Sequence, residues 1–132
     1  MKYLLDTCIV IAVLRGNPRV INALRQIPSF EIGISSISLM ELEVGLQLST
    51  QRRREKRQAL DRFISVYRLL DFSEGDAVEA ASIIAYLRQA GTPIGAYDVQ
   101  LAGVARQRGL TVLTHNLKEF QRVPDLKVND VG

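Results

Sequence analysis

Short apolar segments alternate with segments of helical periodicity along the whole chain, and this order constrains the fold more than any other feature. Runs of branched and aromatic side chains, typical of buried strands, occur at residues 2–5, 30–35, 67–72, 110–114 and, more weakly, 127–131. Helical patterns fill most of the sequence between them. The alternation predicts an α/β fold with a parallel sheet that is covered by helices on both faces.

Length and composition favour one domain. The chain has 132 residues, of which 47% are hydrophobic, so we expect a single domain over residues 1–132. The longest apolar run, residues 8–14, is too short to span a bilayer, and Asp6 interrupts the only stretch that could be a signal peptide. Cys8 is the only cysteine and cannot form an internal disulfide, which is typical of the reducing cytoplasm. The net charge of +3 favours an acidic partner without identifying one.

Three acidic residues occur where a parallel sheet would form its ligand-binding crevice. Asp6 follows the first predicted strand, and such sheets bind ligands beyond the carboxyl ends of their strands. Asp98 is predicted as the first residue of a helix, on its apolar face. Glu41 falls on an apolar stripe of the helix that ends near residue 48, so we expect it to be buried, whereas Glu43 projects about 200° away. The other residues of that stripe are Ile37, Met40, Val44 and Leu48.

Each of these acids also has a purely structural explanation. Asp6 and Asp98 are both suitable N-caps for the helices that follow them. Ser38 and Glu41 match the two ends of a capping box, provided that their helix begins at Ser38. Taken one at a time, the acids therefore leave the choice between cap and functional site open.

Taken together, the acids favour a metal site. Two like charges about 4 Å apart repel by about 4 kcal/mol at an effective dielectric constant near 20. A carboxylate cluster without basic neighbours must therefore protonate one member or bind a cation. Carboxylate oxygens select Mg²⁺ or Mn²⁺, and Mg²⁺ leaves positions for phosphate oxygens. The chain has no zinc ligand set and no phosphate-binding glycine loop, and His115, its only histidine, is more typical of an exposed turn.

Four segments follow one another in the order and at about the spacing of the PIN-domain ribonucleases. They are YLLDTCIVIAVL, SSISLMELEVGL, IGAYDVQLAGVA and VLTHNLKEF. Over nearly its whole length the chain most closely resembles the VapC toxins of bacterial toxin-antitoxin modules. The resemblance implies a PIN-like three-layer sandwich with a central, mainly parallel sheet of four to five strands. It also implies cleavage of RNA that depends on Mg²⁺ or Mn²⁺ and, as in enteric relatives, can include initiator tRNA.

The resemblance assigns roles to individual residues. The acidic positions that bind metal and carry catalysis are matched by Asp6, Glu41 and Asp98. The supporting positions are matched by Thr7, Thr114, Asn116 and Glu119. Asn116 takes the place that an aspartate has in the fully acidic version of the last motif, and Cys8 stands where asparagine or serine is frequent.

The resemblance also implies partners. VapC toxins form homodimers and are inhibited by an antitoxin whose C-terminal segment lies in a hydrophobic groove and reaches a basic side chain toward the acids. The helix that carries Glu41 has a second apolar set, which either joins such an interface or packs under the helix around residues 60–67. This second set consists of Leu39, Leu42 and Leu46.

A basic run lies between these two helices. It is either a footprint for RNA phosphates or a solvated helix face. Its residues are Arg52, Arg53, Arg54, Lys56 and Arg57.

Two other classes of protein remain alternatives to a nuclease. One is a PIN-like module that binds RNA or protein without cutting, although such a module has no physical reason to keep a repulsive acid cluster. The other is a metal-dependent phosphatase acting on small phosphate esters. An aspartyl phosphatase would need a second aspartate at the position of Cys8.

Overall fold

The chain folds around a sheet of five short parallel strands. In the computed structural model, which describes residues 1–132, the strands run in the order β3-β2-β1-β4-β5. They are β1 (Tyr3–Leu5), β2 (Ile32–Ser35), β3 (Arg68–Leu70), β4 (Thr111–Leu113) and β5 (Lys127–Asn129). In the central strand β1, Leu4 pairs with Gly33 on one side and with Val112 on the other. The predicted α/β fold with four to five mainly parallel strands is confirmed.

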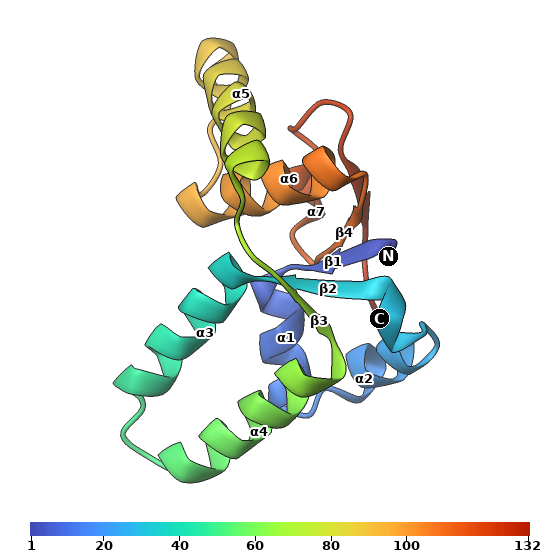
Figure 1. Ribbon diagram of the computed structural model, residues 1–132, viewed down its shortest axis with the longest axis vertical. Helices are drawn as coiled ribbons and strands as arrows, with labels where there is room; N and C mark the ends of the chain where they lie inside the picture. The colour runs from blue at the N-terminus through green and yellow to red at the C-terminus, as the bar shows by residue number, and fades with distance from the viewer.

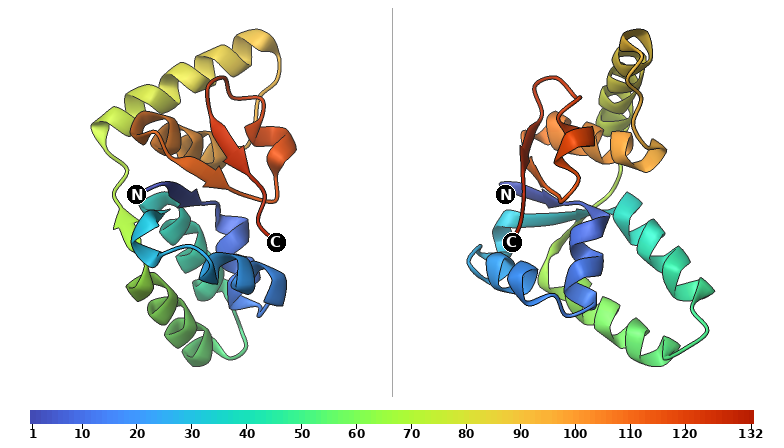
Figure 2. Two further views of the ribbon diagram at one scale, coloured as in Figure 1. Left: turned by 90° about the vertical axis from the view of Figure 1, so that its right-hand side faces the viewer. Right: turned by 180° about the vertical axis from the view of Figure 1, so that it is seen from behind.

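Seven helices cover the two faces of this sheet. They are α1 (Thr7–Leu14), α2 (Pro18–Arg25), α3 (Ser36–Leu48), α4 (Arg53–Val66), α5 (Glu74–Ala90), α6 (Ala96–Arg108) and α7 (Leu117–Phe120). Figure 1 shows α1 to α4 below the sheet and α5 to α7 above it, and both views in Figure 2 show the same layers. None of the helices combines the length and the hydropathy that crossing a membrane requires.

A hydrophobic cluster lies on each face of the sheet. Leu4 and Val112 belong to the cluster with α5 and α6, whereas Leu5 and Leu113 belong to the cluster with α1 to α4. Successive side chains of a strand point to opposite faces, so a strand between two helical layers needs apolar residues at every position. This is why the strands are continuous apolar runs.

Helices α5 and α6 pack at close range. A Cβ atom added at Gly103 would lie 2.9 Å from backbone atoms of Ala80, so only glycine fits at this crossing. At one end of the pair, Arg108 of α6 donates a hydrogen bond of 2.8 Å to Asp76, which belongs to the capping box of α5. These contacts fix the helix that carries Asp98.

The strands are shorter than the apolar runs that predicted them, and two other differences concern where elements begin. β2 begins only at Ile32, because Ser29–Glu31 form one turn of 3-10 helix. α6 begins at Ala96, so Asp98 is its third residue instead of its first. The N-cap of α6 is Gly95, and the N-cap alternative for Asp98 is therefore wrong.

The start of α3 excludes the other capping alternative. Its N-cap is Ser35, whose side chain accepts the backbone N–H of Ile37 at 3.1 Å. Ser38 lies inside the helix, so Ser38 and Glu41 do not form a capping box.

Most of the apolar stripe that was expected to bury Glu41 faces solvent, although Ile37 packs against the core and Glu41 is half-buried. The buried side of α3 carries Leu42 and Leu46, which pack with Leu60 of α4 in one cluster. The second apolar set thus packs against α4, and the expectation of a buried stripe around Glu41 is wrong. Both sides of α3 are apolar, and periodicity alone does not say which side meets the core. The exposed side chains of the stripe are Met40, Val44 and Leu48.

Candidate active site

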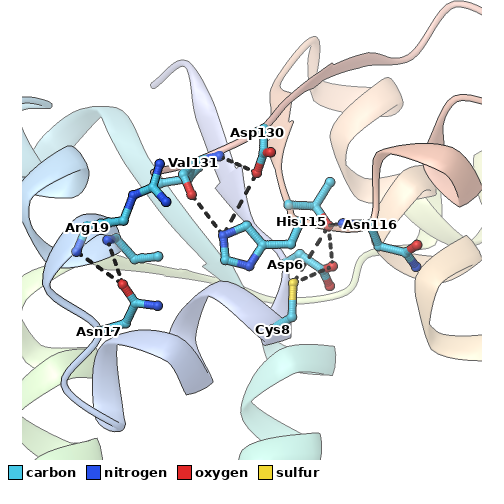
Figure 3. A network of polar contacts seen from close by, with 10 residues as sticks. Asp6, Cys8, Asn17, Arg19, His115, Asn116, Asp130 and Val131 are labelled. Carbon is cyan, nitrogen blue, oxygen red and sulfur yellow. Dashed lines mark hydrogen bonds and ion pairs between the residues drawn. The ribbon is translucent and has the colours of Figure 1, made fainter.

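Asp6 lies at the carboxyl end of β1 and is also the N-cap of α1. Its side chain is nearly buried, with 5% of the residue exposed. Oδ1 accepts the backbone N–H of Thr7 at 2.8 Å, and Oδ2 accepts the hydroxyl of Thr114 at 2.7 Å. The thiol of Cys8 also donates to Oδ2, at 3.2 Å (Figure 3). The N-cap alternative is confirmed for Asp6, and the same donors hold its carboxylate in one orientation.

The thiol of Cys8 is a donor and not a nucleophile. Burial, and in smaller part the charge of Asp6, raises the pKa of this thiol to about 11. The sulfur therefore keeps its proton near neutral pH and can donate it to Asp6.

Thr7 connects Asp6 to helix α3. Its hydroxyl oxygen lies 2.9 Å from Oε1 of Glu41 and 2.9 Å from Oγ of Ser38. One hydroxyl has one proton, and a carboxylate is the stronger acceptor, so we assign the donation of Thr7 to Glu41 and that of Ser38 to Thr7. The sequence analysis considered Ser38, which is fully buried, only as a helix cap and not as a residue of the site. The available signal was its position one turn before Glu41.

The turn after β4 continues the network. The hydroxyl of Thr114, which donates to Asp6, accepts the backbone N–H of Asn116 at 2.8 Å. The side-chain amide of Asn116 donates in turn to the carboxylate of Glu119. The structure therefore brings all four residues predicted as supporting positions next to the predicted acids.

Asp98 lies half-buried in the first turn of α6, where its side chain folds back over Gly95. A Cβ atom at position 95 would lie 2.9 Å from Oδ2 of Asp98. A larger residue at this position would therefore collide with the carboxylate, and glycine does not. The pKa of Asp98 is raised to about 7, first by burial and then by a hydrogen bond with Glu119 and neighbouring negative charge. The charges that contribute belong to Asp6, Glu119 and Glu41. The four acids thus share one electrostatic environment.

The chemistry of this donor set suits a hard divalent cation. All candidate ligands are carboxylate, amide or hydroxyl oxygens, and a cation would offset the negative charge that raises the pKa of Asp98. No group of three His, Cys, Asp or Glu side chains is arranged to hold a metal ion by itself. Mg²⁺ binds through only one or two carboxylates and keeps several waters, so an open set of this kind is compatible with it.

The basic run lies at the start of α4, and two of its residues are paired. Arg52 forms an ion pair with Glu55, and Arg57 forms ion pairs with Glu43 and Asp61. The remaining residues of the run form no ion pair and are Arg53, Arg54 and Lys56. The expected contact of this run with RNA stays a prediction.

Two cavities flank helix α1. The first has a volume of about 300 Å³, is mainly apolar and includes the side of α3 near Glu41. Its walls include Ile11, Arg15, Leu42, Leu46, Lys56 and Leu60. The second has a volume of about 580 Å³ and is more polar. Its walls include Cys8, Ile11, Arg15, Gly16, Asn17 and His115.

Known proteins match this chain over almost all of its length. The PIN domain family matches residues 3–126. A tRNA(fMet)-specific endonuclease VapC from Salmonella typhimurium is 37% identical over 130 residues, covering 98% of both chains. A Ribonuclease VapC2 from Haemophilus influenzae is 33% identical, also over 98% of both chains.

Solved structures of two complexes contain chains of the same fold. DNA-bound VapBC from Salmonella typhimurium has a chain with a TM-score of 0.93 and 36% identity, covering 98% of both chains. VapBC2 from Rickettsia felis, bound to a DNA fragment from its promoter, has a chain with a TM-score of 0.91 and 31% identity over the same share. By sequence and by fold, this chain belongs to the PIN-domain family and, within it, to the VapC ribonuclease toxins of VapBC toxin-antitoxin systems.

Proposed function

We propose that this chain is a toxic endoribonuclease, dependent on Mg²⁺ or Mn²⁺, that acts in the cytoplasm as one PIN domain over residues 1–132. The observation that carries the proposal is the convergence of Asp6, Glu41 and Asp98 from three separate segments on one edge of the sheet. The three acids are close enough to interact electrostatically, because the charges of Asp6 and Glu41 contribute to raising the pKa of Asp98 to about 7.

The residues of the site divide into ligands and groups that orient them. Asp6 and Asp98 would hold the cation directly, and Glu41 would bind directly or through water. When bound, the cation supplies positive charge at the scissile phosphate and acidifies the attacking water. Thr114 and Thr7 fix the orientation of Asp6 and Glu41 through the hydrogen bonds that they donate. One of the carboxylates accepts the proton of the attacking water.

We propose RNA as the substrate and tRNA, including initiator tRNA, as the class to test first. Two relatives that are 37% and 34% identical to this chain are named tRNA(fMet)-specific endonucleases. Asn116 stands where the fully acidic version of the last motif has an aspartate, so the site has one carboxylate fewer to bind metal. This favours a site with one tightly bound metal ion.

We also propose that the toxin forms a homodimer and that an antitoxin inhibits it. The apolar cavity beside Glu41 suits the C-terminal segment of an antitoxin, because it combines leucine walls with a carboxylate that a basic side chain can pair with. The exposed apolar side chains of α3 provide surface for the second copy of the chain.

Cleavage of purified tRNA tests the catalytic proposal. We expect wild-type protein to cut tRNA in Mg²⁺ and not in EDTA, and we expect Asp98→Asn to abolish cleavage. Asp125→Asn is the matched control, because Asp125 is an exposed aspartate in a loop outside the site. Binding without cleavage by folded wild-type protein would favour the non-catalytic module, and equal activity of Asp98→Asn would exclude this site.

Growth of bacteria that express the chain tests the toxin proposal. We expect wild-type protein to arrest growth, and we expect both Asp6→Asn and coexpression of the neighbouring antitoxin gene to relieve the arrest. Asn also serves as an N-cap, so Asp6→Asn removes the charge while keeping the start of α1. Arrest that persists in the Asp6→Asn strain would show that toxicity does not depend on these acids.

A further inference from the structure

The polar cavity beside α1 adjoins the acid site. Its wall includes Cys8, whose thiol donates to Oδ2 of Asp6 at 3.2 Å. It also includes His115, which directly follows Thr114 in the chain. The volume of about 580 Å³ lies within the range of roughly 300 to 1,000 Å³ that is usual for small-molecule sites. The cavity therefore has room for a group of the size of one nucleotide. Such a group would lie next to Cys8, whose side chain contacts Asp6.

Arg15 gives this cavity an unpaired positive charge. It is the C-cap residue of α1, it is exposed, and its guanidinium forms no ion pair or hydrogen bond with the protein. By contrast, Arg57, Arg106 and Arg108 all have carboxylate partners. A free guanidinium beside a phosphodiester-cleaving site is suited to bind a phosphate through two parallel hydrogen bonds.

His115 gives the cavity a ring of fixed orientation. Its Nε2 lies 2.8 Å from the backbone oxygen of Val131 and 3.8 Å from Oδ1 of Asp130. A carbonyl oxygen only accepts, so Nε2 carries the proton in this contact. Figure 3 shows the imidazole turned toward Val131 and Asp130 and away from the carboxylate of Asp6. With 43% of its side chain exposed, the held ring offers a surface on which a base can stack.

We infer that Arg15 and His115 form a subsite for the RNA nucleotide next to the scissile phosphate. Arg15 binds the phosphate of that nucleotide, and the imidazole of His115 stacks on its base. The inference rests on the proposed ribonuclease function and extends it to the positioning of the substrate. The polar side chains of Arg15, Asn17 and His115 favour a nucleotide in this cavity. The more apolar cavity on the other side of Ile11 and Arg15 suits an antitoxin segment better.

Binding of a fluorescently labelled single-stranded oligoribonucleotide in EDTA tests the subsite without requiring cleavage. We expect Arg15→Gln to weaken binding several-fold and to reduce the slope of log affinity against log salt by about 0.7, which corresponds to one lost phosphate contact on a single strand. We expect His115→Ala to weaken binding about tenfold and His115→Phe, which keeps an aromatic ring, to restore most of the loss. The matched control is Arg88→Gln, an exposed arginine on α5 without an ion pair.

The outcomes separate the subsite from the nuclease. If Arg15→Gln and His115→Ala bind RNA as the Arg88→Gln control does, the subsite is wrong even where wild-type protein cleaves tRNA. If both variants bind RNA more weakly but wild-type protein does not cleave in Mg²⁺, the ribonuclease proposal fails and the RNA-binding subsite stands. Unchanged RNA binding combined with weaker copurification of the antitoxin would assign the cavity to the antitoxin and overturn the inference.

Discussion

Replacing Thr114 with valine should destabilise the protein in the absence of metal, although valine has nearly the same shape. Thr114 is fully buried, and its hydroxyl donates to Asp6 at 2.7 Å while it accepts the backbone N–H of Asn116 at 2.8 Å. Valine removes both hydrogen bonds at once. It leaves one oxygen of Asp6 and the N–H of Asn116 without these partners.

The magnitude follows from the two lost bonds. A hydrogen bond to a charged group contributes about 1.5–3 kcal/mol and a neutral one about 0.5–1.5 kcal/mol. We therefore expect a loss of about 2–4.5 kcal/mol in the free energy of unfolding. For a chain of 132 residues, the average unfolding entropy per residue converts this loss into a decrease of about 7–16 °C in Tm.

Urea unfolding followed by circular dichroism, in EDTA and at fixed pH, measures this loss. The control is Thr114→Ser, which keeps the hydroxyl and should stay within about 1.5 kcal/mol of wild type because it loses only a methyl group. The slope of the unfolding free energy against urea should be unchanged in both variants. If Thr114→Val is as stable as Thr114→Ser, then Thr114 does not hold Asp6, and the network described here is wrong.

Three other perturbations address the metal, the basic run and pH. Millimolar Mg²⁺ should raise the Tm of wild-type protein more than that of Asp6→Asn, because a ligand bound only by the folded state stabilises it by mass action; equal increases would indicate a non-specific salt effect. Reversing Arg53 and Arg54 to glutamate should weaken RNA binding and flatten its salt dependence, and an unchanged slope in a titration with salt would assign both to a solvated helix face. Burial raises the pKa of Asp76, but hydrogen bonds from Arg108 and a backbone N–H outweigh it, so the pKa lies below its ordinary value. The contribution of Asp76 to stability is therefore present above the ordinary pKa of about 3.9 and is lost as the pH falls. When unfolding is measured in progressively more acidic buffers, the difference in stability between wild type and Asp76→Asn should shrink.

The sheet and the position of Asp6 were accessible from the sequence because they depend on local pattern. Leu4 and Leu5 are both apolar and face opposite hydrophobic clusters, which is the signature of a strand between two helical layers. Asp6 is the first charge after that strand, so its place at the carboxyl end of the sheet followed from the strand boundary alone.

The surroundings of Glu41 and Asp98 were less accessible because they depend on tertiary contacts. Glu41 is half-buried and accepts a hydrogen bond from Thr7, a residue 34 positions away, and no buried apolar stripe surrounds it. The start of α6 was misplaced because its N-cap, Gly95, has no side chain to mark the boundary. Ser38 was interpreted only as a helix cap because its partner in the structure is a hydroxyl from another helix, which no spacing rule identifies.

The hydrogen bond between Thr114 and Asp6 joins residues 108 positions apart, and this distance in sequence has a consequence for synthesis. A ribosome adds Asp6 before every helix of the fold, while β4 is made only after helices α1 to α6. Until then Asp6 lacks both Thr114 and the neighbouring strand that borders its crevice. The nascent chain is therefore unable to hold Asp6 in its final orientation until β4 has been made and has paired with β1.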